Sequence, residues 1–242
     1  MKLLIIRHGD PDYAADSLTP KGWREAELLS RRLEKMEITS FYVSPLGRAK
    51  DTASVTLKKM GREARELPWL REISAPVARP GLEESHVPWD WLPADWTAVP
   101  AFYDKDRWSG VPAMRAGGVG EVTARACAGL DALLEEHGYR REGALYRAVR
   151  PNRGAAALFC HFGVECVMLG HLLGISPMVL WHGFCAAPSS VTTLCTEERR
   201  SGAAYFRLNA FGDVSHLSAA SEPPAFAARF CETFDCAQER HD

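Results

Sequence analysis

The sequence predicts an α/β fold: a three-layer α/β/α sandwich on a mostly parallel central sheet. Short apolar runs alternate with longer amphipathic segments, and each early run ends close to the start of a helix. Strands joined through helices pair in parallel and carry helices on both faces. No linker divides the chain, which predicts a single domain over residues 1–242, and prolines crowd residues 74–118, which predicts an irregular inserted cap.

The first half of the chain contains two strand-to-helix junctions. Residues 3–6 are uniformly apolar and predict a short buried strand. The helix expected within residues 18–36 begins at Thr19, a capping residue that a proline follows. Residues 41–44 predict the next strand, and Ser44, again followed by proline, is expected to cap a second helix.

The second half adds a helix, a buried strand that runs into a glycine-containing segment, a second helix and two final strands. These elements are expected at residues 121–138, 155–163, 164–173, 189–196 and 203–209.

Composition excludes several classes of protein. A chain of 242 residues with 46% hydrophobic residues can bury a substantial core. Its net charge of −2 disfavours nucleic acid or an anionic membrane as the main partner. No apolar run approaches the roughly 20 residues that cross a bilayer, and the first residues do not resemble a signal peptide, so a cytoplasmic location is expected.

The seven cysteines are odd in number and lack a CxxC spacing. This pattern disfavours both a disulfide framework and a structural zinc site, and most are expected to be small buried side chains. They are Cys127, Cys160, Cys166, Cys185, Cys195, Cys231 and Cys236.

Cationic side chains gather where the predicted parallel strands end. Arg7 and His8 follow the first strand, His161 follows a later one, and Arg48 lies one turn into the second helix. Ligands of open α/β sheets bind outside the carboxyl ends of the strands, so these residues are expected to meet. Guanidinium groups with nearby helix N-termini match a phosphate, and Gly9 would let the backbone approach closely.

Six short motifs follow one another along the chain. They are RHG at 7–9, LTPKG at 18–22, SPLGRAKDTA at 44–53, LREI at 70–73, GEV at 120–122 and CHFG at 160–163. In this order they resemble the histidine phosphatase superfamily, the phosphoglycerate mutase-like enzymes. The resemblance covers most of the chain except residues 74–118 and the tail after about residue 217.

The resemblance implies a role for each matching residue. His8 would be the nucleophile that becomes phosphorylated, and Arg7, Arg48 and His161 would bind the phosphoryl oxygens. Glu72 would be the proton donor. These roles fit the chemistry, since phosphoryl transfer requires an in-line nucleophile, positive charge around the phosphoryl oxygens and a proton for the leaving group.

The expected function is therefore hydrolysis of a phosphomonoester of a small metabolite through phosphohistidine, with no metal and no cofactor. Two alternatives remain open: phosphoglycerate mutase-type transfer and a non-catalytic phospholigand-binding protein, which would not need Glu72. A mutase requires further basic residues, for which Arg79, Arg115 and Lys105 are candidates. Homo-oligomer formation is also open, as is the substrate, because the segment after LREI departs from the family pattern.

Other groups have simpler interpretations. The series His161, Glu165 and His171 suggests a metal site, but the spacing fits a core helix better. His86 and His182 have no assigned partner and are expected to be structural. The aromatic residues of the insertion are expected to pack it onto the body or to form the roof of a pocket. They are Trp89, Trp91, Trp96, Phe102, Tyr103 and Trp108.

Overall fold

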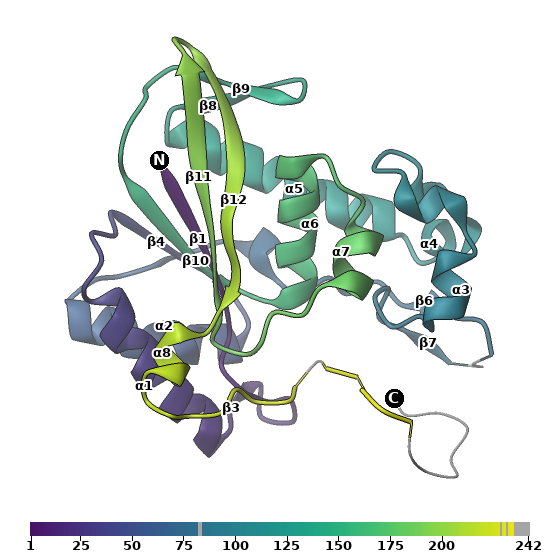
Figure 1. Ribbon diagram of the computed structural model, residues 1–242, viewed down its shortest axis with the longest axis horizontal. Coiled ribbons are helices and arrows are strands. Elements are labelled where there is room, and N and C mark those ends of the chain that lie inside the picture. Colours follow the sequence, from purple (N-terminus) through teal and green to yellow (C-terminus); the bar gives the residue numbers. More distant parts are fainter. Residues whose placement is uncertain (82–83, 228, 231, 235–242) are drawn as a thin grey trace.

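A computed structural model describes residues 1–81, 84–227, 229–230 and 232–234. An eight-stranded mixed sheet runs through the molecule with helices on both faces (Figure 1), which confirms the predicted α/β sandwich. From one edge to the other its strands are β5 (Arg65–Glu66), β4 (Ser40–Val43), β10 (Ala155–Cys160), β1 (Lys2–Arg7), β11 (Val191–Arg200), β12 (Ala203–Asp213), β9 (Leu145–Ala148) and β8 (Tyr139–Glu142).

The sheet is parallel in one half and antiparallel in the other. Strands β5, β4, β10 and β1 are parallel, as crossover connections require, whereas β11, β12, β9 and β8 pair antiparallel. A two-residue turn joins β11 to β12 and another joins β8 to β9, and such short connections allow only antiparallel pairing. The parallel arrangement is thus confined to the strands that carry the predicted site residues.

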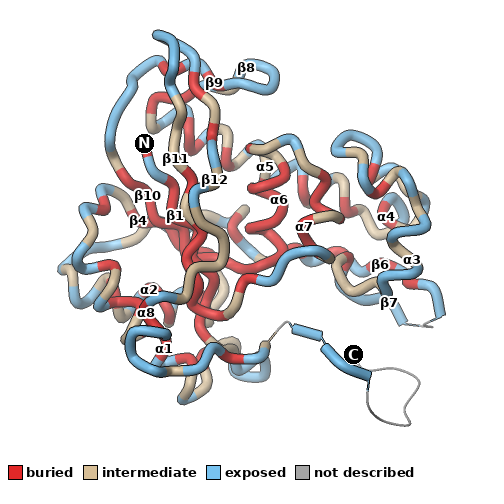
Figure 2. Tube along the Cα trace, viewed as in Figure 1, coloured by how far each residue is buried: buried red, intermediate tan, exposed pale blue. Residues whose placement is uncertain are grey.

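Strand β1 shows why the layers form. Its buried side chains alternate between the two faces: Leu3 and Ile5 belong to the larger core beside α5 and α6, and Leu4 and Ile6 to the smaller core beside α1 and α2. All four are fully buried, and the sheet centre is buried throughout (Figure 2). Burial of each such side chain contributes about 1.5–3 kcal/mol to folding.

Helices cover both faces of the sheet. They are α1 (Pro20–Leu33), α2 (Gly47–Met60) and α8 (Ser215–Ser218) on one face, and α5 (Val119–Glu136), α6 (Phe162–Leu173) and α7 (Pro177–Gly183) on the other. Thr19 caps α1 as predicted, because its hydroxyl accepts from the Gly22 N–H at 3.1 Å. Ser44 is not the cap of α2; that helix begins at Gly47, and Leu46 occupies the capping position.

Residues 74–118 form short elements to one side of the sheet. These are strands β6 (Val77–Ala78) and β7 (Ser85–His86), helices α3 (Pro93–Thr97) and α4 (Pro112–Ala116), and 3₁₀ helices at Pro100–Tyr103 and Trp108–Gly110. The aromatic residues fasten this segment to the body: Phe102 is fully buried, and the Trp108 ring meets Trp181 of α7 edge-on at 5.4 Å. The insertion therefore completes the larger core.

The remaining small elements are the β2 (Pro11–Asp12) and β3 (Ser17–Leu18) pair and the 3₁₀ helix Pro68–Leu70. None of the helices in the described ranges has the length and apolar character needed to span a bilayer. Cys160 and Cys166 are fully buried, whereas Cys185 is exposed, and Cys231 and Cys236 lie outside the described residues.

Candidate active site

Strand register places the site. Arg7 at the end of β1 pairs with Cys160 at the end of β10. The next residues, His8 and His161, therefore lie side by side at the carboxyl ends of these two central strands. The centroids of their imidazole rings are 5.1 Å apart. Strand β4 ends beside β10 and leads through Ser44 into α2, which carries Arg48. Three stretches that are distant in sequence thus converge at the carboxyl ends of the parallel strands, as predicted.

His8 is oriented by its neighbour. Its Nδ1 lies 2.7 Å from the Gly9 carbonyl oxygen, which can only accept a hydrogen bond, so Nδ1 carries the proton. Nε2 then keeps a lone pair, toward which Arg48 Nε donates at 3.4 Å. Burial, with the charges of Arg7 and Arg48, holds the pKa of His8 well below its ordinary value. His8 is therefore a neutral imidazole whose unprotonated nitrogen is Nε2, with a long contact from Arg48.

Packing requires glycine at position 9, next to His8. A Cβ at Gly9 would lie 2.8 Å from the Gly22 carbonyl oxygen of α1. The Gly9 N–H donates to the Thr52 hydroxyl at 2.9 Å, so it is already occupied. Gly9 thus contributes to the site through its carbonyl group, which fixes the tautomer of His8, and not through its N–H.

The two predicted arginines are held in different ways. Arg7 is buried, and its Nη1 donates to the Ala186 carbonyl, while its guanidinium lies 5.9 Å from the centre of the Phe162 ring. Arg48 forms an ion pair with Asp16 at 2.6 Å. Asp16 also accepts from the Gly47 N–H at 2.7 Å, so this carboxylate occupies the N-terminus of α2, where a free N–H had been expected.

His161 lies behind His8 and is completely buried. Its Nε2 lies 2.8 Å from the Ser44 hydroxyl. Ser44 therefore contacts His161 instead of capping α2. Its Nδ1 makes no hydrogen bond with the described residues. Burial, followed by the charges of His8 and the arginines, holds the pKa of His161 well below its ordinary value. His161 is therefore a second neutral imidazole, and it does not line the cavity described below.

Glu72 lies at the same carboxyl ends of the strands, after the 3₁₀ helix that follows β5. Its carboxylate accepts from three backbone N–H groups: Ile73 at 2.9 Å, Gly163 at 3.1 Å and Val164 at 3.0 Å. It therefore takes the N-terminus of α6. Burial nevertheless raises the pKa of Glu72, an effect larger than the lowering by these donors and by Arg7. Such a carboxyl group can hold a proton closer to neutral pH.

A cavity of about 720 Å³ opens above His8. Arg7, Arg48 and Glu72 line it from the body of the molecule, and the β6–β7 hairpin of the insertion supplies the opposite wall. His86 and Trp89 are part of that wall, so the pocket-roof interpretation holds for Trp89, and His86 lies at the cavity instead of in a core. Along with Arg71, these residues bring together positive charge, a nucleophilic imidazole and a carboxyl group.

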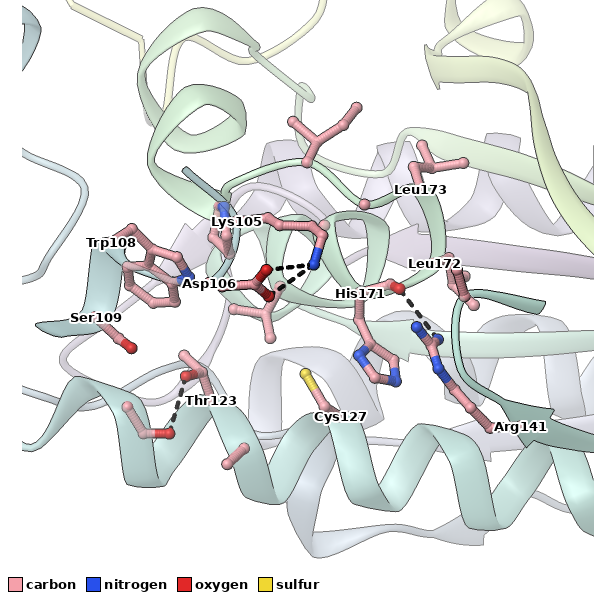
Figure 3. A pocket seen from close by; sticks show the side chains of 18 of the residues that line it. Lys105, Asp106, Trp108, Ser109, Thr123, Cys127, Arg141, His171, Leu172 and Leu173 are labelled. Atoms are coloured by element: carbon pink, nitrogen blue, oxygen red, sulfur yellow. Dashed lines mark hydrogen bonds and ion pairs between the residues drawn. The ribbon is translucent and has the colours of Figure 1, made fainter. Parts of the chain in front are cut away.

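A second cavity of about 430 Å³ lies between α5, α6 and the insertion (Figure 3). Its walls include Lys105, Arg141 and His171 and none of the predicted site residues. The polar groups here are paired with one another: Lys105 with Asp106, and His171 with Asp131 at 2.9 Å. It is separate from the site at the carboxyl ends of the strands.

The alternative candidates fall elsewhere. Arg79 is buried in the insertion and pairs with Asp90, Arg115 donates to the Gly110 carbonyl, and Lys105 lines the second cavity, so none of the three reaches the site. Within the described part of the chain, no three histidine, cysteine or acidic side chains converge as a metal site would require. His182 is bonded to the Met178 carbonyl and stacks on Trp96.

Sequence reasoning missed Asp16, Ser44 and Arg71 as neighbours of the site, whereas it gave Trp89 as part of a possible pocket roof. Asp16 adopts a left-handed backbone conformation, with φ of 46°, which only the three-dimensional path of the chain defines. Arg71 could have been found, because it precedes Glu72 in the LREI motif.

Proteins of known sequence resemble this chain. The model of the histidine phosphatase superfamily (branch 1) matches residues 3–207. The protein named Probable phosphoglycerate mutase GpmB of Serratia proteamaculans is 32% identical over 97 residues, which are 36% of this chain and 45% of that protein. A 2,3-bisphosphoglycerate-dependent phosphoglycerate mutase of Thermoplasma acidophilum is 33% identical over 86 residues, 31% of this chain and 43% of that protein. The matches thus span less than half of these relatives.

Solved structures share the fold. Phosphoserine phosphatase of Entamoeba histolytica in complex with 3-phosphoglyceric acid superimposes with a TM-score of 0.60 at 20% identity, covering 89% of this chain and 98% of that one. A mycobacterial glucosyl-3-phosphoglycerate phosphatase gives 0.56 at 21% identity, covering 87% and 98%. With the family model matched from β1 into β12, the chain belongs to branch 1 of the histidine phosphatase superfamily.

Proposed function

We propose that the protein hydrolyses phosphomonoesters of small metabolites through a phosphohistidine on His8, without a metal. The observation that carries this proposal is the orientation of His8. Its Nδ1–H is committed to the Gly9 carbonyl, so Nε2 is the unprotonated nitrogen; it faces a cavity with positive walls and accepts only a long contact from Arg48 at 3.4 Å, which an incoming phosphoryl group would replace.

The first half of the reaction forms the phosphoenzyme. His8 Nε2 attacks phosphorus as the bond from phosphorus to the leaving oxygen breaks, and that oxygen takes a proton from Glu72. Arg7 and Arg48 stabilise the charge on the three equatorial oxygens, where a loose phosphoryl transition state carries it. His161, which was expected to bind these oxygens as well, lies against the His8 ring and outside the cavity lining. Arg48 must share its guanidinium between the phosphoryl group and Asp16, with which it is paired here.

The second half releases phosphate. Glu72, now a carboxylate, accepts a proton from a water molecule that attacks phosphorus while the bond to His8 Nε2 breaks. The raised pKa of Glu72 supports this double use, because a group that titrates nearer to neutral pH can donate in one step and accept in the next. The folds of the phosphatases named above are consistent with this proposal.

Transfer of the mutase type uses the same phosphoenzyme, and the names of the two sequence relatives favour it as the alternative. In that case the phosphoryl group returns to the bound product in place of water.

The experiment is a screen of phosphorylated metabolites with release of inorganic phosphate as the readout, in the presence of EDTA. Wild-type protein should release phosphate from at least one ester, and His8→Ala should not. Isomerisation of a phosphoglycerate with little phosphate release would support the mutase alternative. Equal activity in wild type and His8→Ala would exclude both mechanisms.

A further inference from the structure

Arg71 stands out among the charged residues of the catalytic cavity. It follows the 3₁₀ helix Pro68–Leu70 and lines the cavity with an exposed side chain. Its charge helps to lower the pKa of His161, so the guanidinium acts on the site electrostatically. Within the residues described by the structure, the Arg71 side chain makes no hydrogen bond and no ion pair.

The other two arginines of the cavity are already engaged. Arg7 donates to main-chain carbonyls and Arg48 is paired with Asp16. Glu72 is the single carboxyl group among the lining residues, and its oxygens accept from three backbone N–H groups instead of from Arg71. Arg71 is therefore the arginine of the cavity wall whose side chain has no hydrogen-bond or ion-pair partner among the described residues.

A phosphoryl group at His8 does not by itself account for Arg71. Arg7 precedes His8 and Arg48 donates to its Nε2, whereas Arg71 precedes Glu72, the group proposed to protonate the leaving oxygen. The remaining wall between Arg71 and the hairpin is largely apolar, with Val87, Trp89 and Phe162. Such a wall fits a carbon skeleton, and an arginine at its edge fits an anionic group on that skeleton.

We propose that Arg71 is a specificity-determining residue that binds a second anionic group, such as a carboxylate, on the leaving-group side of the substrate. The inference rests on the proposed hydrolase function and adds the substrate class: a phosphomonoester whose leaving group carries an apolar skeleton and a negative charge. Arg71 takes the role for which Arg79, Arg115 and Lys105 were candidates.

The test compares two esters of the same shape and different charge, carboxyphenyl phosphate and carbamoylphenyl phosphate, each as ortho, meta and para isomers. For each isomer, the ratio of kcat/KM for the carboxylate to kcat/KM for the amide is measured in wild type and in Arg71→Gln. Differences in leaving-group chemistry affect both proteins alike, so they cancel when the two ratios are compared. Arg115→Gln is the matched control, an exposed arginine of the insertion outside the cavity.

Wild type should prefer the carboxylate in at least one isomer, and Arg71→Gln should lower that ratio about 3- to 30-fold, the range for a solvent-accessible, charge-assisted contact. The preference should shrink as salt is raised. Arg115→Gln should leave the ratio unchanged. Turnover of the esters with no change of ratio in Arg71→Gln overturns the inference and leaves the hydrolase proposal standing.

Absence of turnover with every phosphate ester is the outcome that contradicts the hydrolase proposal itself. Calorimetric binding of the same ester pairs to wild type and Arg71→Gln then decides the inference alone. A carboxylate preference lost in Arg71→Gln supports it, and equal Kd values for carboxylate and amide in wild type overturn it.

Discussion

At the scale of single residues, the site depends on neutral imidazoles placed among cations. His8 and His161 have pKa values far below the ordinary value, chiefly because both are buried and secondarily because arginines surround them. A protonated His8 could not attack phosphorus. The charges of Arg7 and Arg48 thus favour the unprotonated form of His8 in weakly acidic solution, where an ordinary histidine would begin to take up a proton.

Glu72→Gln tests the proton donor. If Glu72 protonates the leaving oxygen, the variant should phosphorylate about 10²- to 10⁴-fold more slowly with alkyl phosphates, and the defect should be smaller with p-nitrophenyl phosphate, whose leaving group needs little protonation. Single-turnover kinetics isolate this step from hydrolysis of the phosphoenzyme. Equal losses with both substrates would exclude Glu72 as the acid. Glu84 would then be the next candidate, since Asp90 is paired with Arg79 and Glu83 lies outside the described residues.

Glu165 gives a prediction about stability. It is buried on α6, and neither carboxylate oxygen has a hydrogen-bond partner of normal geometry among the described residues. Burial raises its pKa from 4.5 to about 7, against smaller effects of Thr192 and Arg7. The folded state therefore binds more protons than the unfolded state between these values, so stability is lost as pH rises from 4.5 to 7.

Glu165→Gln removes that dependence on pH. The stability of Glu165→Gln relative to wild type, measured as the free energy of unfolding, should be higher at pH 8 than at pH 5 by about 2–3 kcal/mol. The reason is that the cost of burying the amide is the same at both pH values, whereas wild type loses stability as Glu165 ionises. Denaturant unfolding at the two pH values provides the measurement. The control is Glu121→Gln at a largely exposed position. An identical difference at pH 5 and pH 8 would show that the pKa of Glu165 is the same in the folded and the unfolded protein.

At the scale of elements, the site is built where α6 begins. Its first backbone N–H groups hold Glu72, and Trp89 of the insertion packs over the same turn. A Cβ at Gly163 would lie 2.5 Å from Glu72 Oε1 and 2.6 Å from the Trp89 ring. Glu72, Trp89 of the insertion and the end of β10 therefore meet at the start of α6. No space is left at Gly163 for a side chain larger than hydrogen.

Gly163→Ala should consequently disturb both activity and stability. Overpacking at this turn is expected to cost about 1–3 kcal/mol of unfolding free energy and to lower kcat/KM by displacing Glu72. Gly183→Ala is the matched control, because a Cβ there meets no atom within 4 Å at the end of α7. Thermal unfolding and kinetics on the two variants give the comparison. If they behave alike, the close approach of Glu72 and Trp89 to Gly163 is incorrect.

At the scale of the whole molecule, the half of the fold that carries the site was predictable. Uniformly apolar runs at β1 and β10 end in charged or imidazole side chains, and parallel pairing places those ends together. The β8–β9 hairpin was missed because its charged residues hide the alternation of an edge pair. Ser44 was misassigned because a serine before proline is an equally good helix signal, and only strand pairing places it against His161.

The insertion was recognised by its prolines, and its aromatic residues were expected either to pack it onto the body or to form the roof of a pocket. Nothing in its sequence pattern indicates that Trp89 and His86 line the cavity at His8 while Phe102 and Trp108 enter the core. Those directions depend on how the segment docks on α5, α6 and α7. For the same reason, the residues that set substrate specificity are the part of the site least accessible to sequence reasoning.

The central claim is that His8 becomes phosphorylated on Nε2. Rapid quench of wild type with a labelled phosphate ester, followed by peptide mapping and ³¹P NMR of the trapped adduct, tests it directly. The account predicts an acid-labile adduct at His8 with phosphorus on Nε2, because Nδ1 donates to Gly9, and no adduct in His8→Ala. Phosphorus on Nδ1 of His8, label on another residue, or turnover without an adduct would contradict it.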